Sequence, residues 1–164
     1  MSSAISFEEV MFTVMTATQD TFKCYMNIEL FAGHVDRKVA PVDSDVTGII
    51  GVAGDRVGYI IVAADRATAQ LVAREMLMDD EPDEDSIRDA IGELINNIAG
   101  SFKTKYHDQY GSVAMGLPLV ISGQLRTVTE PPEEGGSVNV QCKGVTIPFT
   151  NKDGSVNLKV MIYM

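Results

Sequence analysis

Apolar residues recur every three or four positions in two long stretches of the chain, which is the spacing of one face of an α-helix. In the first stretch this face is formed by Phe7, Val10, Met11, Val14 and Phe22. Ser6 and Glu9 stand three residues apart at its start, as in a capping box, where each side chain accepts from the other residue's backbone N–H. We therefore predict a first helix that begins after Ser6 and packs one stripe on a core.

The second stretch predicts a longer helix from Asp83 or Glu84 to about His107. Carboxylates crowd its start and lysines lie near its end, as the helix dipole favours. Its apolar positions fall within one broad arc that must be buried: Ile87, Ala90, Ile91, Leu94, Ile95, Ile98 and Phe102. The opposite face holds Asp89, Gly92, Glu93, Asn96, Gly100 and Lys103. Polar groups and glycines therefore share the face that points away from the core.

β-rich runs account for much of the remaining sequence. The predicted strands are residues 46–53, 57–64, 117–122, 138–149 and 155–163. Gly54 and Asp55 suit a two-residue hairpin turn between the first two strands, and residues 151–154 suit a hairpin loop between the last two. Asp65 caps a short predicted helix through Met76. The sequence thus predicts an α+β fold, with helices packed on one face of a mostly antiparallel sheet.

Length and composition are those of one ordinary globular domain. A chain of 164 residues, 45% hydrophobic and 22% charged, buries roughly two-thirds of its unfolded surface. Cys24 and Cys142 lie far apart, with no CxxC motif, so we expect neither a disulfide nor a zinc site and place the chain in the reducing cytoplasm. We expect no signal peptide and no membrane span. The net charge of −10, without a basic cluster, argues against nucleic acid and membrane surfaces as partners.

Glu93 and Asn96 put a carboxylate and a carboxamide three residues apart on the polar face of the second long helix. Gly92 and Gly100 accompany them, although an interior glycine costs a helix about 1 kcal/mol relative to alanine. One interpretation is a solvated face whose glycines allow close contact between helices of the same protein. The other is a surface that a partner approaches closely. The pattern alone leaves both open.

Three segments carry a resemblance to a known family: Gly48–Val62, Asp89–Gly100 and Gly116–Gly123. Their order and spacing are similar to those of the CheX/CheC family of chemotaxis phosphatases, and the similarity extends over most of the chain. The resemblance implies the CheC-like fold, with residues 1–164 forming a single CheX-like phosphatase domain.

The number of Glu/Asp-x-x-Asn motifs separates the two types within this family. CheC-type members typically carry a second motif in the first long helix. Here Glu8, Glu9 and Asp20 have no asparagine three residues later. The sequence is therefore more similar to the CheX type.

The resemblance implies that the chain binds a phosphorylated CheY-like response regulator and speeds hydrolysis of its aspartyl phosphate. In the family the motif glutamate contacts a receiver lysine and the motif asparagine enters the receiver's active site, which here implies Glu93 and Asn96. A carboxamide can orient water without adding negative charge beside the phosphate, as the glutamine of GTPases does. The resemblance implies no cofactor or metal of the chain's own, because Mg²⁺ belongs to the receiver. It also implies a homodimer formed through the sheets, for which the C-terminal hairpin ending at Tyr163 offers an exposed edge.

Other functions stay open on the sequence. One is a catalytically inactive CheX-like module that binds a receiver or another signalling partner. Another is a structural subunit related to flagellar switch proteins, which usually carry an additional C-terminal domain. A hydrolase with its own nucleophile would need a Ser-His or Cys-His arrangement, which the sequence does not suggest. We expect surface or capping roles for His34 and His107, and solvent exposure for Lys103.

Overall fold

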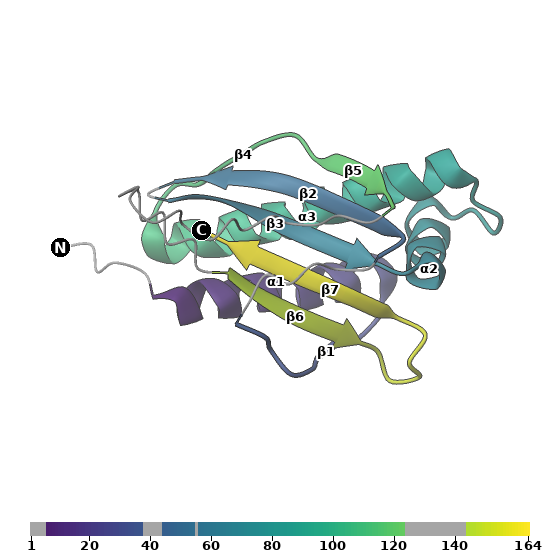
Figure 1. The fold of residues 1–164 in the computed structure, drawn as a ribbon, viewed down its shortest axis with the longest axis horizontal. Helices are drawn as coiled ribbons and strands as arrows, with labels where there is room; N and C mark the ends of the chain where they lie inside the picture. The colour runs from purple at the N-terminus through teal and green to yellow at the C-terminus, as the bar shows by residue number, and fades with distance from the viewer. Residues whose placement is uncertain (1–5, 38–43, 55, 124–143) are drawn as a thin grey trace, which may run out of the picture.

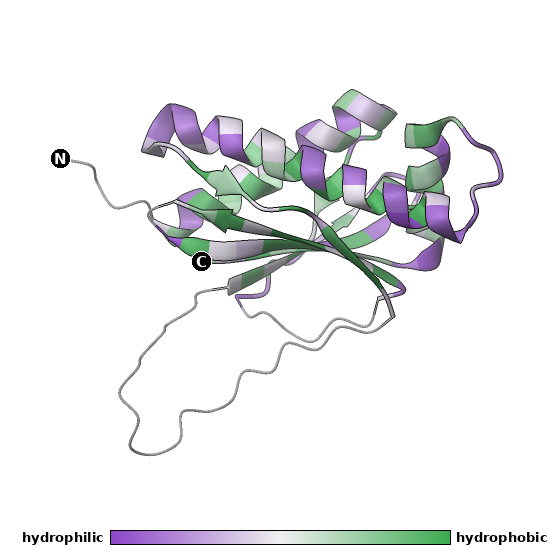
Figure 2. Cartoon of the chain, turned by 90° about the horizontal axis from the view of Figure 1, so that it is seen from above, coloured by the Kyte–Doolittle hydropathy of each residue, from purple (hydrophilic) through white to green (hydrophobic). Residues whose placement is uncertain are grey.

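The computed structural model describes residues 6–37, 44–54, 56–123 and 144–164. In this part of the chain, helices lie on one face of a single antiparallel sheet (Figures 1 and 2). The helices are α1 (Phe7–Met26), α2 (Arg66–Leu77) and α3 (Glu84–Tyr110). Figure 2 shows the sheet coloured mainly as hydrophobic and the outward helix faces mainly as hydrophilic. The predicted α+β class, with helices on one face of the sheet, is confirmed.

The sheet has seven strands in the described residues, in the order β1-β6-β7-β3-β2-β4, with β5 also paired to β2. The strands are β1 (Phe31–Ala32), β2 (Val46–Ala53), β3 (Val57–Ala64), β4 (Ala114–Met115), β5 (Leu119–Ser122), β6 (Gly144–Thr150) and β7 (Asn157–Tyr163). Every neighbouring pair is antiparallel. The bounds of β2 and β3 agree with the prediction at both ends, since each run is long and flanked by turn residues.

β7 lies inside the sheet, between β3 and β6. Its Val160 is opposite Val62 of β3 on one side and Ile147 of β6 on the other. β6 in turn is covered at one end by β1, where Phe31 is opposite Thr150. The C-terminal hairpin was predicted to offer an exposed edge; its last strand, β7, offers none, because both sides of this strand are paired.

The remaining differences from the predicted elements are small. β1 and β4 were not predicted, because a two-residue strand has no periodicity to detect. Three observed bounds differ from the predicted ones by two or three residues: β5 begins at Leu119, β7 begins at Asn157 and α3 ends at Tyr110. The first part of the predicted strand 138–149, Asp55 of the predicted turn, and Cys142 lie outside the described residues.

α1 begins as predicted. The backbone N–H of Ser6 donates to Glu9 Oε2 at 2.7 Å, and the N–H of Glu9 donates to Ser6 Oγ at 3.2 Å, which completes the capping box. Val10, Val14 and Phe22 are buried in the core. At the outer surface, Lys105 of α3 pairs with Asp20 of α1 at 2.6 Å. α1 and α3 are therefore held together both in the core and at the surface.

α3 is fixed on the sheet by its apolar arc, all of which is at most 1% exposed: Ile87, Ala90, Ile91, Leu94, Ile95, Ile98 and Phe102. Gly48 of β2 permits the close approach, because a Cβ there would lie 3.2 Å from Ile91 Cγ2 and 3.3 Å from Ile95 Cγ2. Asp83 caps the helix by accepting from the N–H of Ser86 at 2.8 Å. Burial of the arc sets the rotation of α3 about its axis.

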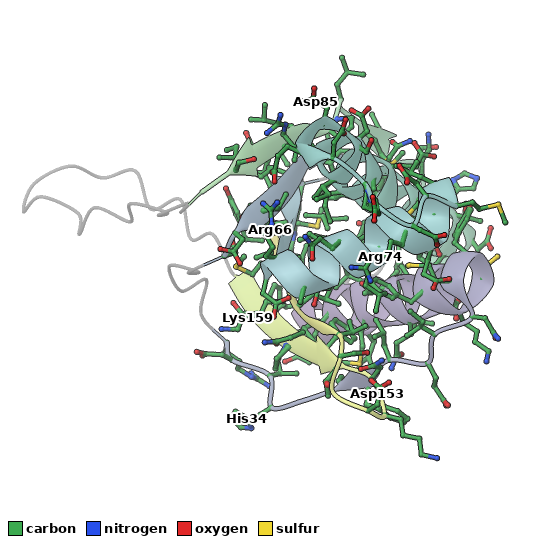
Figure 3. All side chains as sticks on the ribbon, turned by 90° about the vertical axis from the view of Figure 1, so that its right-hand side faces the viewer. His34, Arg66, Arg74, Asp85, Asp153 and Lys159 are labelled. Carbon is green, nitrogen blue, oxygen red and sulfur yellow. The ribbon has the colours of Figure 1, made fainter. Side chains whose placement is uncertain are left out.

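Figure 3 looks at the end of the molecule formed by α2, with the sheet on one side and the helices on the other. Arg66, the first residue of α2, pairs with Glu84, the first residue of α3, so the starts of the two helices are joined. Lys159 of β7 projects from the face of the sheet that is turned away from the helices, because Leu158 and Val160 on either side of it are buried in the core. None of the described helices is long and apolar enough to cross a membrane.

The face of the sheet away from the helices also carries apolar side chains. Ile61, Ala63 and Met161 form a small buried cluster there, against which Ile49 and Tyr163 pack. Other apolar residues of the same face remain accessible: Val57, Tyr59 and Leu119. This set of residues, the outer-face patch, is separate from the core under the helices.

Candidate functional site

The rotation of α3 turns Glu93 and Asn96 away from the sheet. Both side chains are exposed, while the residues between them, Leu94 and Ile95, are buried. Within the described part of the chain, the side chains of Glu93 and Asn96 have no hydrogen-bond or ion-pair partner. A carboxylate and a carboxamide are thus presented together on the outer face of a firmly packed helix, with their hydrogen-bonding capacity unused.

A β-bulge brings a second segment beside this face. Along β2, Val52 is opposite Met115 of β4 and Ile49 is opposite Leu119 of β5, so the three residues 116–118 face the two residues 50 and 51. The extra residue interrupts the strand, and bulges of this kind redirect side chains. Pro118 of the bulge lines the same hollow as Glu93 and Asn96 of α3.

Glu93 and Asn96 therefore lie in a shallow groove between α3 and the bulge. We call this the bulge groove; it has a volume of about 580 Å³. Its lining residues are Arg88, Asp89, Gly92, Glu93, Asn96, Pro118 and Val120. Arg88 is already paired with Asp85 one turn earlier. The carboxylate of Glu93 is consequently available to a cation on another molecule.

A second groove runs along the other side of Asn96, between α3 and α1. This helix groove has a volume of about 470 Å³ and shares Asn96 with the bulge groove. Its other lining residues are Asp20, Thr21, Cys24, Tyr25, Asn97, Gly100, Ser101, Thr104 and Met115. Asn96 thus stands where the two grooves meet, and a molecule that covers it contacts α1 or the bulge as well as α3.

Sequence reasoning found the two polar residues but not the walls around them. Pro118 belonged to the segment that carries the resemblance, yet nothing in a local pattern shows that it lies beside Glu93. Cys24, which lines the helix groove, is exposed. The reason is that Phe22 and Met26 set the buried stripe of α1, so Cys24 between them faces outward.

The other polar candidates lie away from the two grooves. Lys103 and His107 are exposed along α3 and line neither groove, and His34 projects from the surface beyond β1 (Figure 3). Among the described residues, no three His, Cys, Asp or Glu side chains come together in a way that could hold a metal ion. Glu93 and Asn96 remain the candidate site residues.

Several solved structures share this fold. Chemotaxis protein CheX from Desulfovibrio desulfuricans has a TM-score of 0.79 at 24% identity, over 95% of this chain and 99% of that one. A CheC-like superfamily protein from Shewanella sp. PV-4 has a TM-score of 0.78 at 22% identity, over 97% and 98%. A chain of the CheX–CheY–BeF₃–Mg²⁺ complex from Borrelia burgdorferi has a TM-score of 0.69 at 23% identity, over 94% and 96%. No curated protein sequence matches the chain.

The sequence itself carries the family assignment. Residues 46–150 match the family described as chemotaxis phosphatase CheX. The matched region is more than half of the chain and includes all of α3, the bulge and the β2–β3 hairpin. The resemblance seen in the sequence is thereby confirmed, and the chain belongs to the CheX family of chemotaxis phosphatases.

Proposed function

We propose that this protein accelerates hydrolysis of the aspartyl phosphate on a CheY-like receiver domain, with α3 as the docking and catalytic element. The observation that carries the proposal is the joint exposure of Glu93 and Asn96 beside two grooves, on a helix whose rotation is fixed by its buried arc. Membership of a chemotaxis phosphatase family supports the reaction type. The CheX–CheY complex from Borrelia burgdorferi supports the class of partner.

Asn96 is proposed to position the attacking water. An acyl phosphate is already reactive, so the requirement is to hold water in line with phosphorus rather than to create a strong nucleophile. A carboxamide can accept a hydrogen bond from that water through its oxygen and donate one to a phosphoryl oxygen through its nitrogen. Because the group is neutral, it adds no repulsion beside the phosphate. Correct placement of a reacting group can contribute on the order of 10²-fold or more to the rate.

Glu93 is proposed to orient the receiver. Its carboxylate has no partner among the described residues, and the resemblance pairs it with a receiver lysine. An ion pair of this kind fixes register and raises the association rate, and it contributes more to affinity when it is desolvated in the complex. The carboxylate stands one turn from Asn96, so docking at Glu93 constrains where the carboxamide enters.

We propose no cofactor or metal for the chain itself. The Mg²⁺ that neutralises the developing charge in phosphoryl transfer would belong to the receiver. We place the reaction in the cytoplasm and treat residues 1–164 as a single phosphatase domain.

The direct test is dephosphorylation of a phosphorylated CheY-like receiver with Mg²⁺ present. Wild type should accelerate loss of phosphate, and Asn96→Ala should remove the acceleration while leaving receiver binding largely intact. Asn157→Ala is the matched control, because it makes the same chemical change at an exposed position on β7. Binding without acceleration by wild type would instead establish an inactive regulatory module. Equal activity of Asn96→Ala and wild type would refute the site assignment.

We also propose a homodimer that forms through the sheet. Its support is the outer-face patch, where Val57, Tyr59 and Leu119 leave apolar surface accessible. Light scattering should give twice the monomer mass for wild type and the monomer mass for Tyr59→Lys. A wild-type protein that stays monomeric at high concentration would remove this part of the proposal.

A further inference from the structure

No contact within the described structure requires a glycine at position 100. A Cβ placed there would meet no other described atom within 4 Å, the adjacent backbone of its own helix aside. At Gly92, by contrast, a Cβ would lie 3.4 Å from Val120 Cγ2, so that glycine is in contact with β5. Alanine is favoured over glycine inside a helix. Contact between elements of this chain therefore explains Gly92 better than Gly100.

Gly100 lies one helical turn beyond Asn96, on the same face of α3. Both residues line the helix groove, whose opposite wall includes the exposed Tyr25 of α1. The hydroxyl of Thr104 donates to the carbonyl oxygen of Gly100 at 3.1 Å. The backbone at Gly100 is thus open to contact but already hydrogen-bonded, which suits close van der Waals packing.

The free space at Gly100 is important because the side chain of Asn96 is short. The carboxamide of asparagine is bonded directly to Cβ, so it enters a neighbouring active site only when the backbone of α3 approaches that molecule closely. A side chain one turn away would hold the two surfaces apart. At Gly100 nothing projects. The space that a side chain would occupy is available to a partner.

We infer that the phosphorylated receiver packs directly over Gly100 in the helix groove, and that the missing side chain at this position determines how deeply Asn96 enters the receiver's active site. The inference rests on the proposed function. It makes Gly100 a positioning residue, which acts through Asn96 and does not touch the reacting atoms. It also extends the docking surface from the bulge groove to the side of α3 that faces α1.

The test is a size series at this position, Gly100→Ala and Gly100→Leu, against Asp108→Leu. Asp108 is exposed two turns beyond Gly100 and lines neither groove, so its substitution adds bulk to α3 away from the site. Three quantities are measured for each protein: the thermal midpoint, the affinity for a receiver activated with BeF₃⁻ and Mg²⁺, and the single-turnover rate of dephosphorylation.

Stability and function should move in opposite directions. Gly100→Ala should raise the thermal midpoint by about 2–4 °C, because helix propensity improves without a clash. Receiver affinity should fall about tenfold, equivalent to about 1.4 kcal/mol. Gly100→Leu should lose more affinity and turnover than Gly100→Ala, while Asp108→Leu should match wild type in both. A purely structural role for Gly100 predicts the opposite sign for the thermal midpoint.

The outcomes separate this inference from the function on which it rests. If Gly100→Ala and Gly100→Leu bind and dephosphorylate like wild type while Asn96→Ala is inactive, the inference is overturned and the proposed function stands. If wild type neither binds nor dephosphorylates any receiver, both are overturned. A loss of affinity accompanied by a lower thermal midpoint would also overturn the inference, since the variant would then be damaged in its fold.

Discussion

Gly58 of β3 leaves almost no room for a side chain. A Cβ at this position would lie 1.9 Å from the backbone oxygen of Tyr163 and 2.9 Å from Cα of Met164. The obstacle is backbone, so the end of β7 must move in Gly58→Ala. That movement breaks the last pairing of β3 with β7 and the ring contact between Tyr59 and Tyr163, whose centroids are 5.4 Å apart.

The expected loss can be estimated from these contacts. An aromatic pair contributes about 0.5–1.5 kcal/mol, a hydrogen bond about 0.5–1.5 kcal/mol, and exposure of a buried methionine about 1.5–3 kcal/mol. Met164 is 8% exposed and would be uncovered only in part. Gly58→Ala should therefore lower the free energy of unfolding by about 2–4 kcal/mol, and the thermal midpoint by roughly 5–15 °C for a chain of this size.

The assay is urea denaturation followed by circular dichroism, with Gly51→Ala as the control. Gly51 lies in β2, the partner strand of the same hairpin, where a Cβ would meet only Tyr59 Cε1 at 3.8 Å. Gly51→Ala should be neutral or slightly stabilising, because alanine restricts the unfolded chain. Equal midpoints for Gly58→Ala and Gly51→Ala would show that the end of β7 adjusts freely and that the steric reasoning is wrong.

Three further predictions concern the core, the helix start and the site. Ile98→Ala should lower the free energy of unfolding by about 2–5 kcal/mol, measured by denaturation, because Ile98 is fully buried on the face of α3 that packs on the sheet. The backbone N–H of Ser86 lowers the pKa of Asp83 below its ordinary value of 3.8, so the stability this carboxylate contributes is present above pH 3.8 and is lost as the pH falls through the lower folded-state pKa. In thermal melts between pH 2 and 6, the thermal midpoint should fall less at acid pH for Asp83→Asn than for wild type. Glu93→Gln should raise the dissociation constant of the receiver complex. The ratio of this constant to the wild-type constant should decrease at high salt, where the ion pair is screened. A ratio that does not change with salt would contradict the proposed pairing.

Local patterns predicted the parts of this fold that local forces determine. The capping box of Ser6 and Glu9, the cap of Asp83 and the strands of the first hairpin all depend on residues near one another in sequence. The exposed position of Glu93 follows from the apolar arc of α3 in the same way. Each of these could be read from spacing and residue type alone.

What could not be predicted depends on contacts between distant segments. The position of β7 inside the sheet follows from its pairing with β3, which no turn dictates. The two grooves exist because α1 and the bulge lie on either side of α3. The periodicity of α1 predicts a helix but not its place beside α3, and the bulge has no periodicity at all. Pro118 could therefore be read as part of a strand but not as a wall of the candidate site.

The bulge at residues 116–118 also determines how the sheet ends. β4 and β5 together cover one side of β2, but the interruption between them leaves no long outer strand among the described residues, and Pro118 has no N–H to offer. The opposite edge is β1, with only two residues. Short and interrupted edges are poor templates for the addition of a foreign strand. The same irregularity that carries a proline to the candidate site thus protects a β-rich chain against edge-to-edge aggregation.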